Sequence, residues 1–193
     1  MRKTLTALFL FLSATTGVAY ADATIVILRH GEKPAAGLGQ LNCQGLQRAL
    51  RLPAKIIGTY GTPTAIYAPN PAVKKADLGR DYNYIRPLAT IEPLAIQVGV
   101  PVHLDWSMKQ TDELAAYLLS QTGLQIVAWE HHWAVELARA LLRRGGGNAE
   151  AVPAWPGNDF DSLYVVRVDS AGKARFTREA QELSGLPEQC PAY

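Results

Sequence analysis

The chain has 193 residues, with 19 basic and 17 acidic side chains and a formal net charge of +2. Two of the basic residues lie in the first 21 positions, which hold no acidic residue, so the remaining 172 residues carry 17 charges of each sign. This balance argues against a nucleic-acid-binding surface, which needs an excess of basic residues. A length of 172 residues suits one domain with a real hydrophobic core.

The first 21 residues have the pattern of a secretory signal peptide. They begin with Arg2 and Lys3, continue with an apolar run over residues 5–12, and end in a small-x-small cleavage site, Ala19-Tyr20-Ala21. The run is too short for a comfortable membrane span. We therefore expect cleavage after Ala21, one mature domain of residues 22–193 without a membrane span, and a periplasmic or secreted location. An uncleaved anchor and an ordinary buried helix are the alternatives.

The mature part opens with a strand and a helix. Residues 24–28 form a continuous apolar, β-branched run, which predicts a central strand covered on both faces. Asn42 is placed to cap a helix over about residues 43–60, and Gly61 is placed to end it. Pro53 falls inside this helix, where it predicts a kink or a break.

Strands and helices alternate along the rest of the chain. The remaining expected elements are strand 64–68, loop 72–83, helix 85–98, strand 100–104, helix 111–121, strand 125–129, helix 133–144, strand 163–168 and a paired segment 174–177. This alternation predicts an α/β domain with a mostly parallel central sheet.

Two histidine motifs follow predicted strands. Arg29-His30-Gly31 follows the first strand, and Glu130-His131-His132 follows strand 125–129. Ligands of open α/β sheets bind beyond the carboxyl ends of the strands, where free backbone N–H groups favour an anion. Arg29 and Arg86 offer bidentate donors that match phosphate oxygens, and Gly31 allows a close approach of backbone to ligand. The pattern predicts a phosphate site.

The sequence resembles the histidine phosphatase superfamily, which includes phosphoglycerate mutases and many acid phosphatases. Four stretches carry the resemblance in the order the family has them: Arg29-His30-Gly31-Glu32, "YAPNP" at 67–71, "IRPLATIEPLA" at 85–95 and "VAWEHHWAVELARAL" at 127–141. The resemblance implies the family's three-layer α/β/α, phosphoglycerate mutase-like fold.

The resemblance also implies roles. His30 is the expected nucleophile that takes the phosphoryl group, and Arg29, Arg86 and His131 are expected to hold the phosphate oxygens, close to Gly31. A neutral imidazole attacks phosphorus in line, fixed positive donors stabilise the equatorial oxygens, and water then hydrolyses the phosphohistidine. No cofactor and no metal is expected, because the two arginines and a protonated His131 take the electrostatic role of a metal.

Some assignments stay open. His132 competes with His131, which we prefer because it comes directly after the strand. The general acid is unassigned, and four carboxylates are considered for it: Asp105, Asp112, Glu113 and Glu130. Without an acid, only good leaving groups should react. The segment "WPGNDFD" at 155–161 is either the mouth of the pocket or a turn with a buried aromatic residue. Cys43 and Cys190 are either a disulfide or two buried thiols.

The function expected from the sequence is that of an exported, metal-independent phosphoric monoester hydrolase. Its substrate is a small-molecule phosphomonoester or one on a sugar or lipid. A phosphate-ester-binding protein of the same fold with weak or no turnover is the alternative, because the general acid is missing. A mutase is a weaker reading, since it needs a cytosolic phosphorylated cofactor. The sequence does not indicate the oligomeric state.

Overall fold

The computed structural model describes residues 22–192, so the predicted signal peptide lies outside the described residues. Six strands form one sheet in the order β5-β2-β6-β1-β7-β8. Four neighbouring strands run parallel to one another: β1 (Ala23–Arg29), β2 (Ala65–Tyr67), β5 (Val102–His103) and β6 (Gly123–Trp129). β7 (Ser162–Val168) is antiparallel to both β1 and β8 (Ala174–Ala180). The expected mostly parallel sheet is confirmed.

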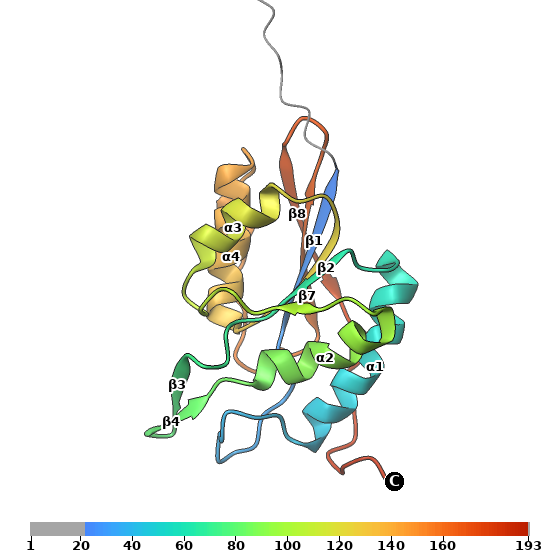
Figure 1. Ribbon diagram of the computed structural model, residues 1–193, viewed down its shortest axis with the longest axis vertical. Coiled ribbons are helices and arrows are strands. Elements are labelled where there is room, and N and C mark those ends of the chain that lie inside the picture. Colours follow the sequence, from blue (N-terminus) through green and yellow to red (C-terminus); the bar gives the residue numbers. More distant parts are fainter. Residues whose placement is uncertain (1–21, 193) are drawn as a thin grey trace, which may run out of the picture.

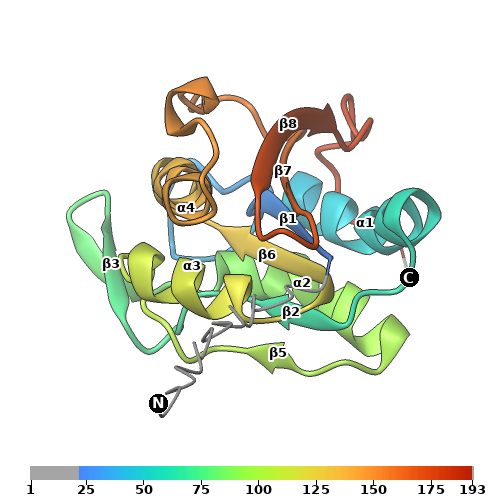
Figure 2. The same cartoon turned by 90° about the horizontal axis from the view of Figure 1, so that it is seen from above.

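Helices cover both faces of the sheet, which gives the three layers (Figures 1 and 2). The four helices are α1 (Cys43–Tyr60), α2 (Arg86–Val98), α3 (Thr111–Leu119) and α4 (His131–Arg144). Alternate residues of β1 serve opposite faces: Ile25 and Ile27 pack with α3 and α4, and Val26 and Leu28 pack with α1 and α2. All four side chains are fully buried, which explains why β1 reads as a continuous apolar run.

Helix α1 passes through Pro53 without a break. Of the two expected alternatives, a break is therefore wrong and a kink stays a prediction, since Pro53 removes one backbone hydrogen bond. Leu52, Pro53 and Ile56 are all buried against the sheet, and this packing holds the helix together across the proline. The predicted cap is present, because the Asn42 side chain accepts a hydrogen bond of 2.8 Å from the Gly45 N–H.

The segment expected as a loop at 72–83 is a β-hairpin, which corrects that prediction. Strands β3 (Lys74–Asp77) and β4 (Arg80–Asn83) pair antiparallel, with Asp77 opposite Arg80. The two residues of the turn, Leu78 and Gly79, both have positive φ, as a type I′ turn requires. The hairpin was missed because its strands are short and polar and do not show an apolar alternation.

Some boundaries also differ from the expectation, and one short element was not expected. Helix α4 starts at His131 instead of residue 133, β8 continues to Ala180, and a short 3-10 helix lies at Ala149–Ala151. Cys43 and Cys190 form a disulfide, which joins the first turn of α1 to the C-terminal segment and resolves the alternatives left open by the sequence. None of the helices between residues 22 and 192 is both long and apolar enough to cross a membrane.

Candidate active site

The two histidine motifs lie side by side at the carboxyl edge of the sheet. β1 and β6 pair along their whole length, with Arg29 opposite Trp129. The backbone continues this pairing beyond the strands, because the His30 N–H donates to the Trp129 carbonyl at 3.1 Å. His131 is the first residue of α4, immediately after the end of β6, so both histidines occupy the edge where α/β proteins bind ligands.

His30 is buried as a neutral imidazole. It is only 3% exposed, and burial lowers its pKa to about 3, helped by the charges of Arg86 and Arg29. Its Nδ1 lies 2.7 Å from the Gly31 carbonyl oxygen, which can only accept, so Nδ1 carries the proton. This tautomer leaves Nε2 with a free lone pair, and Nε2 is therefore the nucleophilic atom.

Gly31 is held by contacts to two helices. Its N–H donates to the Thr90 hydroxyl of α2 at 2.9 Å, and that hydroxyl donates in turn to the Arg86 carbonyl at 2.8 Å. A Cβ at Gly31 would come within 3.0 Å of the Gly45 backbone in α1, and a Cβ at Gly45 would come within 2.4 Å of the Glu32 carbonyl oxygen. Backbone packing against α1 thus accounts for the glycine, and its contact with phosphate stays a prediction.

Arg29 is fixed by the loop that precedes β7. Its Nη1 donates to the carbonyls of Gly157 and Asp159 at 2.7 and 3.0 Å, and its guanidinium stacks on the Phe160 ring at 3.8 Å. Its Nε is buried and has no hydrogen-bond partner among the described residues. The segment "WPGNDFD" contains the buried aromatic residue of one sequence alternative, Trp155, and its Phe160 contacts Arg29. That it forms the mouth of a substrate pocket stays a prediction.

Arg86 is the first residue of α2 and is 2% exposed. Its Nη1 donates to the Asp77 carboxylate at 2.7 Å, and Lys33 reaches the same carboxylate at 3.2 Å. These cations hold the pKa of Asp77 below its usual value, although burial alone would raise it. The Arg86 Nε is buried without a partner among residues 22–192, so Asp77 orients the guanidinium but leaves one donor free.

His131 and Lys75 both contact the carboxylate of Glu130. The His131 Nδ1 lies 2.9 Å from the Glu130 carboxylate, and the Lys75 Nζ lies 3.4 Å from the same oxygen. Glu130 also caps α4, because it accepts from the N–H groups of His132 and Trp133. Burial would raise the pKa of Glu130, but His131 and Lys75 lower it to about 2. Glu130 is therefore a carboxylate at neutral pH.

Donor atoms of Glu130, His131 and His132 lie within 4.8 Å of one another, which is close enough for a cation. The Glu130 carboxylate, however, already accepts two backbone N–H groups and contacts Lys75. Its chemistry in this structure is that of a helix cap and an ion-pair partner, and a metal would have to displace Lys75.

The other carboxylates considered for the general acid are exposed. The Asp105 side chain is 69% exposed and lies 3.8 Å from His103. Asp112 is 67% exposed and pairs with Arg144, the last residue of α4, far along the helix from His131. Glu113 is exposed in the first turn of α3. The buried carboxylates that do reach the site, Asp77 and Glu130, are both held in the ionised form.

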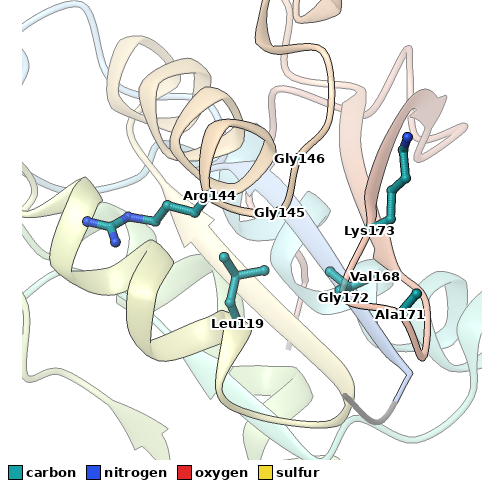
Figure 3. A pocket seen from close by; sticks show the side chains of 8 residues that line it. All are labelled: Leu119, Arg144, Gly145, Gly146, Val168, Ala171, Gly172 and Lys173. Carbon is teal, nitrogen blue, oxygen red and sulfur yellow. The ribbon is translucent and has the colours of Figure 1, made fainter. Parts of the chain in front are cut away.

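A cavity of about 380 Å³ lies at the opposite end of the sheet, between the end of α4 and the β7–β8 turn (Figure 3). Val168, one of its lining residues, pairs with Ala23 at the start of β1, whereas His30 follows the end of that strand. Its two cations, Arg144 and Lys173, point away from each other. The lining residues include no carboxylate, histidine, cysteine or hydroxyl group, so we place the candidate site at His30.

Sequence reasoning found the histidines and the two arginines but missed Tyr84, Asp77, Lys75 and Thr90. Tyr84 packs edge-on to the His30 ring at 5.8 Å between centroids. Lys75 and Asp77 belong to the hairpin, which was expected to be a loop, and Tyr84 directly follows it. The one sequence feature that could have drawn attention to Tyr84 is its position two residues before Arg86.

No family model and no curated protein sequence matches this chain. Solved structures do. A protein histidine phosphatase, SixA, in complex with tungstate has a TM-score of 0.56 at 14% identity, covering 82% of this chain and 97% of the other. The phosphoglycerate mutase of Plasmodium falciparum has a TM-score of 0.54 at 13% identity, with coverages of 90% and 99%. The phosphoglycerate mutase of Bacillus anthracis has a TM-score of 0.50 at 11% identity, with coverages of 86% and 96%. The described chain therefore has the phosphoglycerate mutase-like fold of the histidine phosphatases.

Proposed function

We propose that this protein is an exported phosphatase that hydrolyses phosphomonoesters through a phosphohistidine intermediate on His30. The observation that carries the proposal is the state of His30: a buried neutral imidazole with Nε2 free, close to Arg29 and Arg86. Each of these arginines keeps a buried Nε–H without a partner in the described chain. An acceptor-rich oxyanion is the ligand that such donors fit.

In the first step the Nε2 lone pair of His30 attacks phosphorus, and the bond from phosphorus to the ester oxygen breaks. The imidazole ring becomes positive, and its Nδ1–H stays directed at the Gly31 carbonyl, which stabilises that charge. Arg29, Arg86 and His131 stabilise the phosphoryl oxygens. In the second step water attacks phosphorus, the P–N bond breaks, and inorganic phosphate leaves with His30 neutral again.

The leaving group departs without help from a protein acid. Asp77 and Glu130 are the carboxylates with direct contacts to Arg86 and His131, and both are ionised at neutral pH. Protonation of the leaving oxygen must then come from water, which suits substrates with good leaving groups. The same feature favours the second candidate, a phosphate-ester-binding protein of this fold with little turnover.

Export is proposed from the signal-peptide pattern of residues 1–21, and the Cys43–Cys190 disulfide suits an oxidising compartment. The substrate lies among phosphomonoesters of sugars, lipids or small metabolites, and the proposed chemistry needs no metal or cofactor.

Hydrolysis of para-nitrophenyl phosphate tests the proposal. The mature protein should turn over this activated ester in the presence of a chelator, and His30→Asn should abolish turnover. His103→Gln is the matched control, since the half-exposed His103 lies on the edge strand β5 and should keep the wild-type rate when replaced. Binding of phosphate esters without turnover would favour the second candidate. Loss of activity in the chelator would point to a metal at Glu130, His131 and His132.

A further inference from the structure

Tyr84 occupies the centre of the candidate site without a role in the proposed mechanism. It is 2% exposed, and its ring lies edge-on to His30, with 5.8 Å between the centroids. Two cations lie over the same ring: the Arg86 guanidinium at 4.9 Å and the Lys75 ammonium at 5.1 Å from the centroid. The hydroxyl is also close enough to Arg29 and Glu130 to feel their charges.

The Tyr84 hydroxyl is buried and makes no hydrogen bond of standard geometry to a described residue. The Arg86 side chain lies near enough to act on its oxygen as a donor, but the hydroxyl proton itself has no acceptor among residues 22–192. Burial raises the pKa of Tyr84, and the opposing effect of Arg86 does not cancel it, so the phenol stays protonated. A buried hydroxyl without a hydrogen bond has lost its bonds to water and gained none in exchange, so such a group is rare in a folded protein.

The same region holds three other buried side-chain nitrogens without a hydrogen-bond partner in the described chain: the Nε atoms of Arg29 and Arg86, and the Nδ1 of His131, which lies 2.9 Å from the Glu130 carboxylate. The Arg86 guanidinium lies over the Tyr84 ring, this ring lies edge-on to His30, and Arg29 precedes His30 in the chain. The Tyr84 hydroxyl and the two Nε donors therefore belong to residues that surround His30. A compact group with several acceptor oxygens could accept hydrogen bonds from all of these donors, and the proposed phosphoryl group is such a group.

We propose that the Tyr84 hydroxyl donates a hydrogen bond to an oxygen of the phosphoryl group held at His30, and so acts as a further substrate-binding residue. This inference rests on the proposed function. It assigns to Tyr84 a contact that exists only in the occupied site, unlike the ring contacts to His30, Arg86 and Lys75, which are present already.

Orthovanadate binding by the mature protein, measured by calorimetry, tests this contact in Tyr84→Phe. The substitution keeps the ring and removes only the hydroxyl. A hydrogen bond to a charged group is worth about 1.5–3 kcal/mol, so affinity for vanadate should fall roughly 10-fold to 100-fold, with a similar loss in kcat/KM. Tyr82→Phe, the same change two residues earlier in β4, should bind vanadate like the wild type.

The melting temperature without oxyanion is the second readout. Because the free protein buries the Tyr84 hydroxyl unpaired, Tyr84→Phe should melt at or above the wild-type temperature. Wild-type vanadate affinity in Tyr84→Phe would overturn the inference and leave the proposed function standing. A lower melting temperature would show that the hydroxyl already has a partner, and would overturn it too. A wild-type protein that binds no vanadate would overturn the proposed function itself, and this inference with it.

Discussion

The buried neutral state of His30 should make the stability of the protein depend on pH. Its pKa is lowered from 6.5 to about 3, so between these values the unfolded chain binds a proton that the folded chain does not. The free energy of unfolding should therefore fall as the pH falls through this window. The full slope is about 1.4 kcal/mol per pH unit, which gives a loss of about 2 kcal/mol between pH 6.5 and pH 4.5.

Above pH 4.5 the effect of His30 on stability can be measured apart from the effects of the buried carboxylates. Glu130 and Asp77 have lowered pKa values, so their contribution to stability is lost only as the pH falls below the unfolded values of 4.5 and 3.8. Urea unfolding of the wild type and of His30→Asn at pH 6.5, 5.5 and 4.5 measures the slope. The wild type should lose about 2 kcal/mol more than the variant. Parallel losses in the two proteins would refute the assignment of a buried neutral imidazole.

Three further results are expected. Reduction of the Cys43–Cys190 disulfide, which joins residues 147 positions apart, should lower the free energy of unfolding by about 2–5 kcal/mol, as measured by thermal unfolding. The value of kcat should not change, and a large fall in kcat would contradict this expectation. Thr90→Val removes the acceptor of the Gly31 N–H, so it should cost about 1–3 kcal/mol of stability and lower kcat, and wild-type values for both would show that this bond does not hold the loop. Across a series of aryl phosphates, kcat/KM should fall steeply as the leaving-group pKa rises, and a flat profile would reveal a general acid.

Most of the fold and the chemical motifs can be predicted from the sequence because their signals are local. The apolar run at 24–28 predicts a buried strand, and the caps at Asn42 and Gly61 predict where a helix begins and ends. His30 and His131 follow strands, and neighbouring parallel strands bring their carboxyl ends together. Such features need no knowledge of distant contacts.

The rest depends on contacts between distant residues. The hairpin at 74–83 has no apolar face in its sequence. Its contribution to the site is visible only in the structure, where Asp77 pairs with Arg86 and Lys75 pairs with Glu130. The lowered pKa of Glu130 comes first from the adjacent His131 and then from Lys75, which is 55 positions away and could not be paired with Glu130 from the sequence. The unbroken helix at Pro53 is decided by burial against the sheet, a tertiary effect that outweighs the local preference.

The most direct test of the proposed mechanism is to trap the phosphoenzyme and locate the phosphate. The mature protein is mixed with para-nitrophenyl phosphate, quenched in alkali within milliseconds and digested for mass spectrometry. The account predicts phosphate on the peptide that contains His30, stable in alkali and lost in acid, as phosphohistidine requires. Turnover with no such adduct, or with the phosphate on His131 or on an acid-stable residue, would contradict it.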